Sequence, residues 1–129
     1  GEYGIKTTCT WPQDTNIMLL RGHIHERGSA YALDWTSAEG TKRVLEVNPW
    51  LPEYTTEYQP GNDYAPGEFK VSAGDTFTTY CHWHNDTGDT LVSPQEMCNT
   101  FGVAYPLDEP FECDADFDVL PPGSTPPRP

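Results

Sequence analysis

Apolar and polar residues alternate along several short segments of this chain, and no long stretch repeats apolar residues at helical spacing. Alternation is typical of a strand with one buried face, because successive side chains point to opposite sides. Thirteen prolines and eleven glycines also interrupt the chain every few residues, which disfavours long helices. Six segments therefore predict strands: NIMLLRGHIH (16–25), SAYALDWT (29–36), KRVLEV (42–47), EFKVS (68–72), DTFTTYCHWH (75–84) and NTFGVAYP (99–106).

Short strands at regular spacing predict an all-β fold, an antiparallel β-sandwich or jelly roll. ERGS at 26–29 predicts a hairpin turn between the first two strands, and PQEM at 94–97 predicts one helical turn. The length of 129 residues indicates one domain. We assign the β-sandwich to residues 1–120 and the proline-rich stretch 121–129 to a linker or disordered tail.

The charge balance narrows the class of partner. Seven basic residues against twenty acidic residues give a net charge of −13, which would repel the phosphate backbone and argues against nucleic acid. No apolar run is long enough to cross a membrane. Because no basic-then-apolar leader precedes the first strand, we expect a mature or excised piece. We also expect a monomer.

Cysteine usage indicates the compartment. Cys9, Cys81, Cys98 and Cys113 form an even set without a CxxC pair, which disfavours a zinc knuckle and favours two disulfides. The alternative is a set of free thiols in the cytosol. Of the three pairings that four cysteines allow, we favour Cys9–Cys113, which joins the two ends, and Cys81–Cys98, which closes an internal loop. We therefore expect a secreted or periplasmic protein.

All four histidines occur in two HxH pairs. The pairs are His23 and His25 in RGHIHERG, and His82 and His84 in TTYCHWHND. Residues i and i+2 of a strand share a face, so the two imidazoles of each pair can approach one metal ion. In the first pair the alternation then points Ile24 to the opposite face, beside Leu20 and Met18.

Several arrangements of these histidines stay open on spacing alone. They are a four-histidine zinc or copper centre, two separate two-histidine sites, one site with a bystander pair, and exposed histidines that bind nothing. Met97, beside Cys98 in SPQEMCN, adds a further donor. A thioether is a soft ligand that favours Cu(I) over zinc, and the alternative for Met97 is a residue that fills a gap in the core.

The HIH motif after the first cysteine, the EMCN motif and the outer cysteines together resemble a known domain. It is the C-terminal, catalytic-copper domain of the copper type II, ascorbate-dependent monooxygenases, which include peptidylglycine α-hydroxylating monooxygenase and dopamine β-monooxygenase. The likeness runs from Cys9 to Cys113. It implies a jelly-roll β-sandwich with the two favoured disulfides. It also implies copper bound by His23, His25 and Met97, and hydroxylation of a C–H bond with O2 and ascorbate.

The resemblance also bears on the substrate, a small molecule or a peptide. In the peptide-hydroxylating branch, an arginine two residues before the first ligand and an asparagine after EMC contact the carboxylate end of the substrate. Arg21 and Asn99 occupy these places. The accompanying tyrosine is Phe101 here, which removes a hydroxyl donor and argues against a peptide.

The full enzymes of this family carry a second copper on an N-terminal domain, where three histidines bind it and it delivers electrons. Only His82 and His84 remain after the first pair, so this chain cannot supply both sites. We expect either an electron-transfer copper domain upstream or a stand-alone copper protein for storage, delivery or scavenging. His82 and His84 form an additional metal site or an exposed strand end. A third alternative is a structural module with idle histidines.

Overall fold

The computed structural model describes residues 2–25, 27–55, 59–85, 98–111, 117–121 and 123–127. Each of the six predicted segments overlaps a strand, and the all-β prediction is confirmed. The strands are β1 (Glu2–Thr10), β2 (Thr15–Ile24), β3 (Gly28–Ser37), β4 (Gly40–Val47), β5 (Gly61–Asp63), β6 (Lys70–Val71), β7 (Thr76–His84), β8 (Cys98–Tyr105) and β9 (Phe117–Val119). One 3-10 turn, η1 (Pro52–Thr55), lies between β4 and β5. Among the described residues, no helix is long and apolar enough to cross a membrane.

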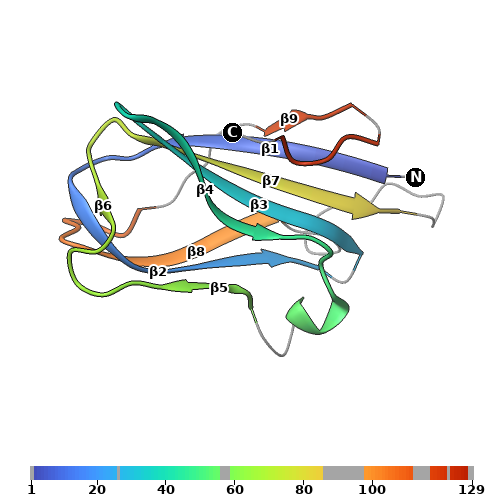
Figure 1. The fold of residues 1–129 in the computed structure, drawn as a ribbon, viewed down its shortest axis with the longest axis horizontal. Coiled ribbons are helices and arrows are strands. Elements are labelled where there is room, and N and C mark those ends of the chain that lie inside the picture. The colour runs from blue at the N-terminus through green and yellow to red at the C-terminus, as the bar shows by residue number, and fades with distance from the viewer. Residues whose placement is uncertain are drawn as a thin grey trace.

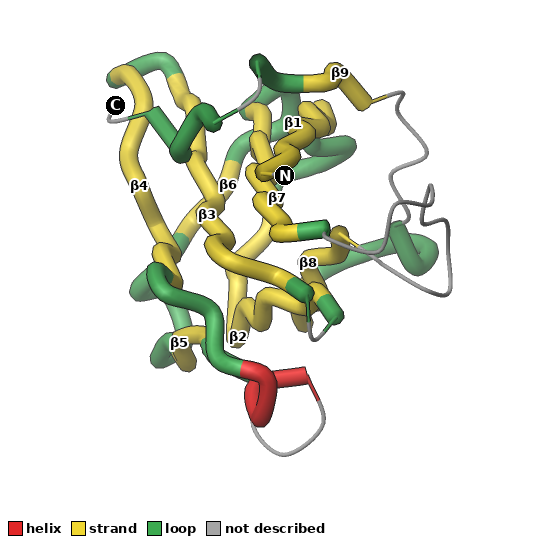
Figure 2. Tube along the Cα trace, turned by 90° about the vertical axis from the view of Figure 1, so that its right-hand side faces the viewer, coloured by secondary structure: helices red, strands yellow, loops and turns green. Residues whose placement is uncertain are grey.

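The strands form two antiparallel sheets that face each other (Figures 1 and 2). The first sheet has the order β4-β3-β7-β1-β9. In the second, β2 pairs with β5, β6 and β8. The core fills the space between the sheets. The largest fully buried side chains among the described residues are Ile17, Ile24, Tyr31, Leu33, Val71 and Cys81. This arrangement is a β-sandwich.

The predicted Cys81–Cys98 disulfide is confirmed, and it connects β7 of one sheet to β8 of the other. Its two cysteines lie 17 residues apart in the sequence. In the chain-entropy account, a crosslink over a loop of this size stabilises the fold by about 3 kcal/mol. Cys113 lies outside the described residues, as does the predicted turn at 94–97, so the Cys9–Cys113 pairing stays a prediction.

The prediction of a hairpin at ERGS is wrong. β2 and β3 follow each other in the chain but belong to different sheets, with β3 between β4 and β7. The connection therefore crosses from one sheet to the other. A turn signal reports only that the chain reverses its direction, and it does not say whether the two strands pair.

A β-bulge in β2 changes which residues of that strand enter the core. Opposite β8, Ile17 pairs with Ala104 and Leu19 pairs with Val103, so Met18 is the extra residue. Strict alternation places Met18 inside with Leu20 and Ile24. Because the bulge shifts the alternation by one residue, Ile17 is buried at 1% exposure, whereas Met18 is only half-buried.

The outer side of the five-stranded sheet carries a buried ion pair. Asp34 on β3 is almost fully buried and accepts hydrogen bonds from the Arg43 guanidinium on β4. Arg43 also donates to Glu46 at 2.7 Å and to the carbonyl oxygen of Pro127. The carboxylates and the carbonyl together satisfy a guanidinium that is largely withdrawn from water.

The described part of the proline-rich stretch therefore contacts the sheet. Upstream of it, the backbone N–H of Leu120 donates to the carbonyl oxygen of Gly4 at 2.8 Å. Within it, Ser124 is half-buried and its N–H donates to the Pro121 carbonyl oxygen. Pro127 thus ties the stretch to β4, and Leu120 ties the residue before it to β1. The domain boundary at residue 120 stays a prediction.

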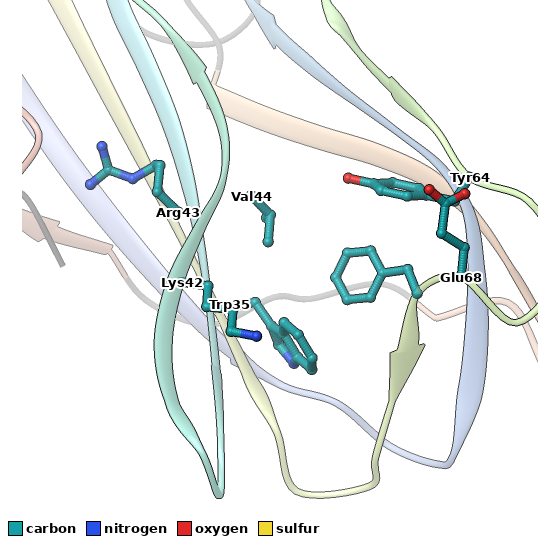
Figure 3. A pocket seen from close by; sticks show the side chains of 7 residues that line it. Trp35, Lys42, Arg43, Val44, Tyr64 and Glu68 are labelled. Atoms are coloured by element: carbon teal, nitrogen blue, oxygen red, sulfur yellow. The ribbon is translucent and has the colours of Figure 1, made fainter.

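An aromatic cleft lies between β4 and the segment that joins β5 to β6 (Figure 3). Its volume is about 290 Å³, and its lining residues are Trp35, Lys42, Arg43, Val44, Tyr64, Glu68 and Phe69. Trp35 stands near the end of β3, whereas Tyr31, near its start, lies beneath β2 close to the first histidine pair. The cleft therefore lies apart from that pair.

Candidate metal centre

His23 and His25 lie side by side at the end of β2. Their ring centroids are 5.2 Å apart and the ring planes are nearly perpendicular, at 79°. Both side chains are partly exposed, while Ile24 between them is fully buried. The alternation therefore presents both imidazoles on the outer face of the four-stranded sheet, at a separation that leaves room for one ion to bind a nitrogen of each.

Contacts on both sides of the pair fix the backbone that carries it. The N–H of Gly28 donates to the carbonyl oxygen of His25 at 2.8 Å. The hydroxyl of Thr55 donates to the carbonyl oxygen of Ile24 at 2.9 Å. Gly22 has no side chain, and a Cβ there would lie 2.6 Å from the ring of Tyr31. The absence of a side chain thus allows the buried tyrosine to pack directly beneath the strand.

The environment of His23 favours the neutral imidazole. Burial, and to a lesser extent the charge of His25, lowers its pKa below the ordinary value. A metal ligand must be neutral imidazole, so the ring is ready to bind at neutral pH. The Nε2 atom of Gln59 lies 3.4 Å from Nδ1 of His23.

β8 runs beside the histidine pair. Asn99 pairs directly with His23, and residues opposite each other on paired strands project to the same face. The ring centroid of Phe101 lies 6.1 Å from that of His23. Met97 lies outside the described residues, but the next residue, Cys98, pairs with Ile24, between the two histidines.

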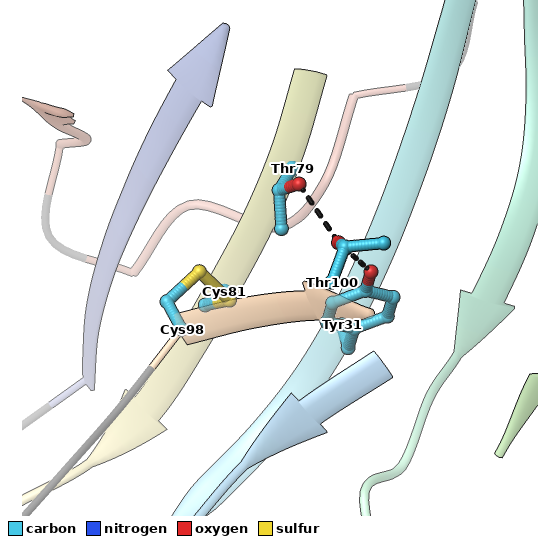
Figure 4. The surroundings of a disulfide bond; sticks show 5 residues. All are labelled: Tyr31, Thr79, Cys81, Cys98 and Thr100. Atoms are coloured by element: carbon cyan, nitrogen blue, oxygen red, sulfur yellow. Dashed lines mark hydrogen bonds between the residues drawn. A yellow bond between two sulfur atoms is a disulfide. The ribbon is translucent and has the colours of Figure 1, made fainter. Parts of the chain in front are cut away.

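The start of β8 is fastened to the other sheet at two points (Figure 4). One is the Cys81–Cys98 disulfide. The other is a chain of hydroxyls: Tyr31 bonds with Thr100, whose oxygen lies 3.0 Å from that of Thr79. Burial raises the pKa of Tyr31 above its ordinary value, so this phenol stays protonated. Both points flank Asn99 and therefore fix its position beside the histidines.

The guanidinium of Arg21 is bound within the protein. Its Nη2 donates to the carboxylate of Asp63 at 2.5 Å, and its Nη1 donates to the carbonyl oxygens of Leu20 and Asn62 at 3.0 and 3.1 Å. The structure thus brings Arg21 and Asn99 to the face that carries the first histidine pair. Asp63 already neutralises the arginine.

The second histidine pair has a different environment. His82 is only 4% exposed, and its ring covers Gly4, where a Cβ would lie 2.7 Å from the ring. Leu120 packs against the same glycine position, 3.2 Å from that Cβ. His84 is exposed. Because one ring is covered and the other is not, the two imidazoles differ in access to solvent, and a metal site at this pair stays a prediction.

Within the described parts of the chain, no three or more His, Cys, Asp and Glu side chains come together in a way that could hold a metal ion. A centre at His23 and His25 would therefore need a donor of another type or one from the undescribed residues. Met97 meets both conditions, because its thioether is another type of donor and the residue lies among the undescribed ones, next to Cys98.

The sequence did not reveal that β8 directs its large apolar side chains outward. Phe101, Val103 and Tyr105 are exposed, while the alternate positions on this strand hold small residues, Thr100, Gly102 and Ala104. The alternation of large and small residues in NTFGVAYP was the available signal. It is easily read in the wrong direction, because large apolar residues usually face the core.

No known family model matches this chain, and no curated protein matches it.

Proposed function

We propose that this chain is a copper-binding domain related to the catalytic-copper domain of the ascorbate-dependent monooxygenases, with His23, His25 and Met97 as ligands. The contact between the two histidine rings, at the exposed end of β2 and opposite the start of β8, carries the proposal. The proposal includes the jelly-roll topology, the Cys9–Cys113 disulfide and a secreted or periplasmic location.

The donor set fits copper. Two imidazole nitrogens and a thioether sulfur suit copper, whereas Mg²⁺ and Ca²⁺ prefer oxygen ligands. The lowered pKa of His23 supports the neutral form that binding requires. Both rings reach the surface, so an ion between them would keep a side open to a small molecule, as a catalytic centre needs.

When bound, copper supplies one-electron redox chemistry toward O2, and ascorbate is the reductant that the family resemblance suggests. The protein holds the ion through its histidines and fixes the neighbouring strand through Cys98 and Thr100. Asn99 and Phe101 border the open side, where a substrate would be oriented with a C–H bond toward the site. The class of reaction is hydroxylation of that bond.

The second candidate is a copper protein without catalysis, for storage, delivery or scavenging. This chain has four histidines, so it cannot itself hold a copper bound by three histidines in addition to the proposed site. The two candidates share the same ligands. They differ in whether an electron-transfer copper domain restores oxygen consumption.

X-ray absorption of the Cu(I)-loaded chain tests the ligand set. We expect two nitrogen neighbours and one sulfur neighbour, with the sulfur lost in Met97→Ala and one nitrogen lost in His23→Ala. His84→Ala, in the other HxH pair, should leave this shell unchanged, because the proposal assigns this copper to the first pair. An all-nitrogen shell that Met97→Ala leaves unchanged would overturn the proposed ligand set.

Ascorbate-driven oxygen uptake, measured after an electron-transfer copper domain is added, then separates the enzyme from the stand-alone binder.

A further inference from the structure

A row of exposed apolar side chains begins beside His23 and follows β8. Phe101, Val103 and Tyr105 are 49%, 52% and 41% exposed. They occupy alternate positions after Asn99, which pairs with His23, so all of them share the face that carries the histidine. Leu19 on β2 pairs with Val103 and extends the row across the strands.

The row is continuous with the proposed metal centre. The ring of Phe101 approaches that of His23, with 6.1 Å between the centroids. A molecule lying on Phe101 and Val103 would therefore reach the imidazole that we assign to the metal. Scattered apolar residues are common on protein surfaces, but a contiguous exposed apolar patch marks an interaction surface.

The charges around the row disfavour an anionic ligand. Arg21 pairs with Phe101 across the strands, but its guanidinium is already bound by Asp63 and by two carbonyl oxygens. The chain as a whole carries a net charge of −13. A carboxylate lying on the row would lose hydration without gaining an unpaired guanidinium as its partner.

We infer that Leu19, Phe101, Val103 and Tyr105 form the substrate-binding surface of the metal centre, and that it takes a neutral molecule with an aromatic or alkyl body. The inference rests on the proposed function. It differs from the expectation drawn from Arg21 and Asn99, which would place a carboxylate at this face. Apolar contact with the row would hold the substrate body, and Phe101 would bring its near end beside His23.

Two probes with the same ring and different charge test the inference: 2-phenylethanol, which is neutral, and phenylacetate. Each is titrated into the Cu(I)-loaded chain while the amide NMR shifts of β8 are followed. We expect saturable shifts with 2-phenylethanol and at least tenfold weaker binding of phenylacetate. The double variant Phe101→Ser with Val103→Ser should weaken 2-phenylethanol at least tenfold.

The matched control is Phe117→Ser with Val119→Ser, which changes the same residue types on β9 of the other sheet. These side chains are 59% and 74% exposed, so we expect no change in binding of either probe. Asp63→Ala tests the role given to the Arg21 ion pair. It releases the Arg21 guanidinium, so phenylacetate should bind at least fivefold more tightly than to the unaltered chain.

Equal binding of the two probes, wild-type affinity in the β8 variant, or no gain in Asp63→Ala would overturn the inference. Self-association that the β8 variant abolishes would also overturn it, because the row would then cover a second copy of the chain. Cu(I) affinity is measured on every variant. If copper binds and the probes fail these tests, only the substrate inference fails, whereas a chain that does not bind copper refutes the proposed function itself.

Discussion

Replacing Tyr31 by phenylalanine tests how the two sheets are held together beside the candidate metal centre. The change removes one hydroxyl, which bonds with Thr100, and keeps the ring that packs beneath Gly22. A hydrogen bond contributes about 0.5–1.5 kcal/mol net, and an unsatisfied buried partner costs about 1–3 kcal/mol. The Thr100 hydroxyl keeps its contact with Thr79, so it loses only one of its two hydrogen-bond partners. We therefore expect a destabilisation of about 1–2 kcal/mol.

Urea unfolding under non-reducing conditions measures this loss. The midpoint should fall while the slope stays unchanged, because the variant exposes the same surface on unfolding. Tyr3→Phe on β1 is the control, since Tyr3 is exposed and a surface change of this kind should stay within about 0.5 kcal/mol. Thr100→Val and the double variant complete a cycle, in which we expect a coupling of at least about 0.5 kcal/mol.

Three results would refute this reasoning. An unchanged midpoint in Tyr31→Phe would mean that the hydroxyl chain contributes nothing to the fold. A loss above about 4 kcal/mol is the size seen when a large core side chain is truncated, and it would mean that the ring has moved. Additive effects of the two single variants would show that Tyr31 and Thr100 act independently.

Three further changes test other parts of the structure. Cys81→Ala combined with Cys98→Ala should lower the free energy of unfolding by about 3 kcal/mol in urea, and an unaltered midpoint would contradict the role given to the crosslink. Arg43→Ala leaves the buried Asp34 carboxylate unpaired and should lower the free energy of unfolding by about 3–5 kcal/mol. Arg21→Ala removes a more exposed ion pair and should lower it by under about 1 kcal/mol. Similar losses in the two variants would contradict the burial argument. Gly22→Ala places a methyl group against the Tyr31 ring and should lower the free energy of unfolding by about 1–3 kcal/mol. It should also weaken Cu(I) binding. Wild-type stability in urea and wild-type Cu(I) affinity would together show that the strand adjusts freely.

The strands were largely predictable because their alternation is a local property. β5 and β9 were missed because they have three residues each, too few to show a period. β1 was missed because threonines and a lysine conceal its apolar positions. The partner of each strand was not predictable from local pattern. Thus β2 and β3 separate into different sheets, and the bulge at Met18 moves Ile17 into the core.

The features of the candidate site also divide into those that local sequence pattern predicts and those that it does not. The spacing of HIH predicted a shared face for His23 and His25, because that depends only on strand geometry. The partner of Arg21 was not predictable, since Asp63 lies 42 residues further along the chain. The burial of His82 depends on its packing over Gly4, which lies near the start of the sequence. Local pattern therefore predicted the candidate ligands but not the charge state of their surroundings.

The position of β1 has a consequence for how the chain acquires its fold. β1 lies between β7 and β9, which are among the last strands in the sequence. Its backbone groups find their neighbours only after residues 76–119 are available, so the order of synthesis does not match the order of pairing. Strand pairs of such large sequence separation form slowly. A fragment that ends before Thr76 leaves β1 and β3 without the strand between them, and we expect it to remain unfolded.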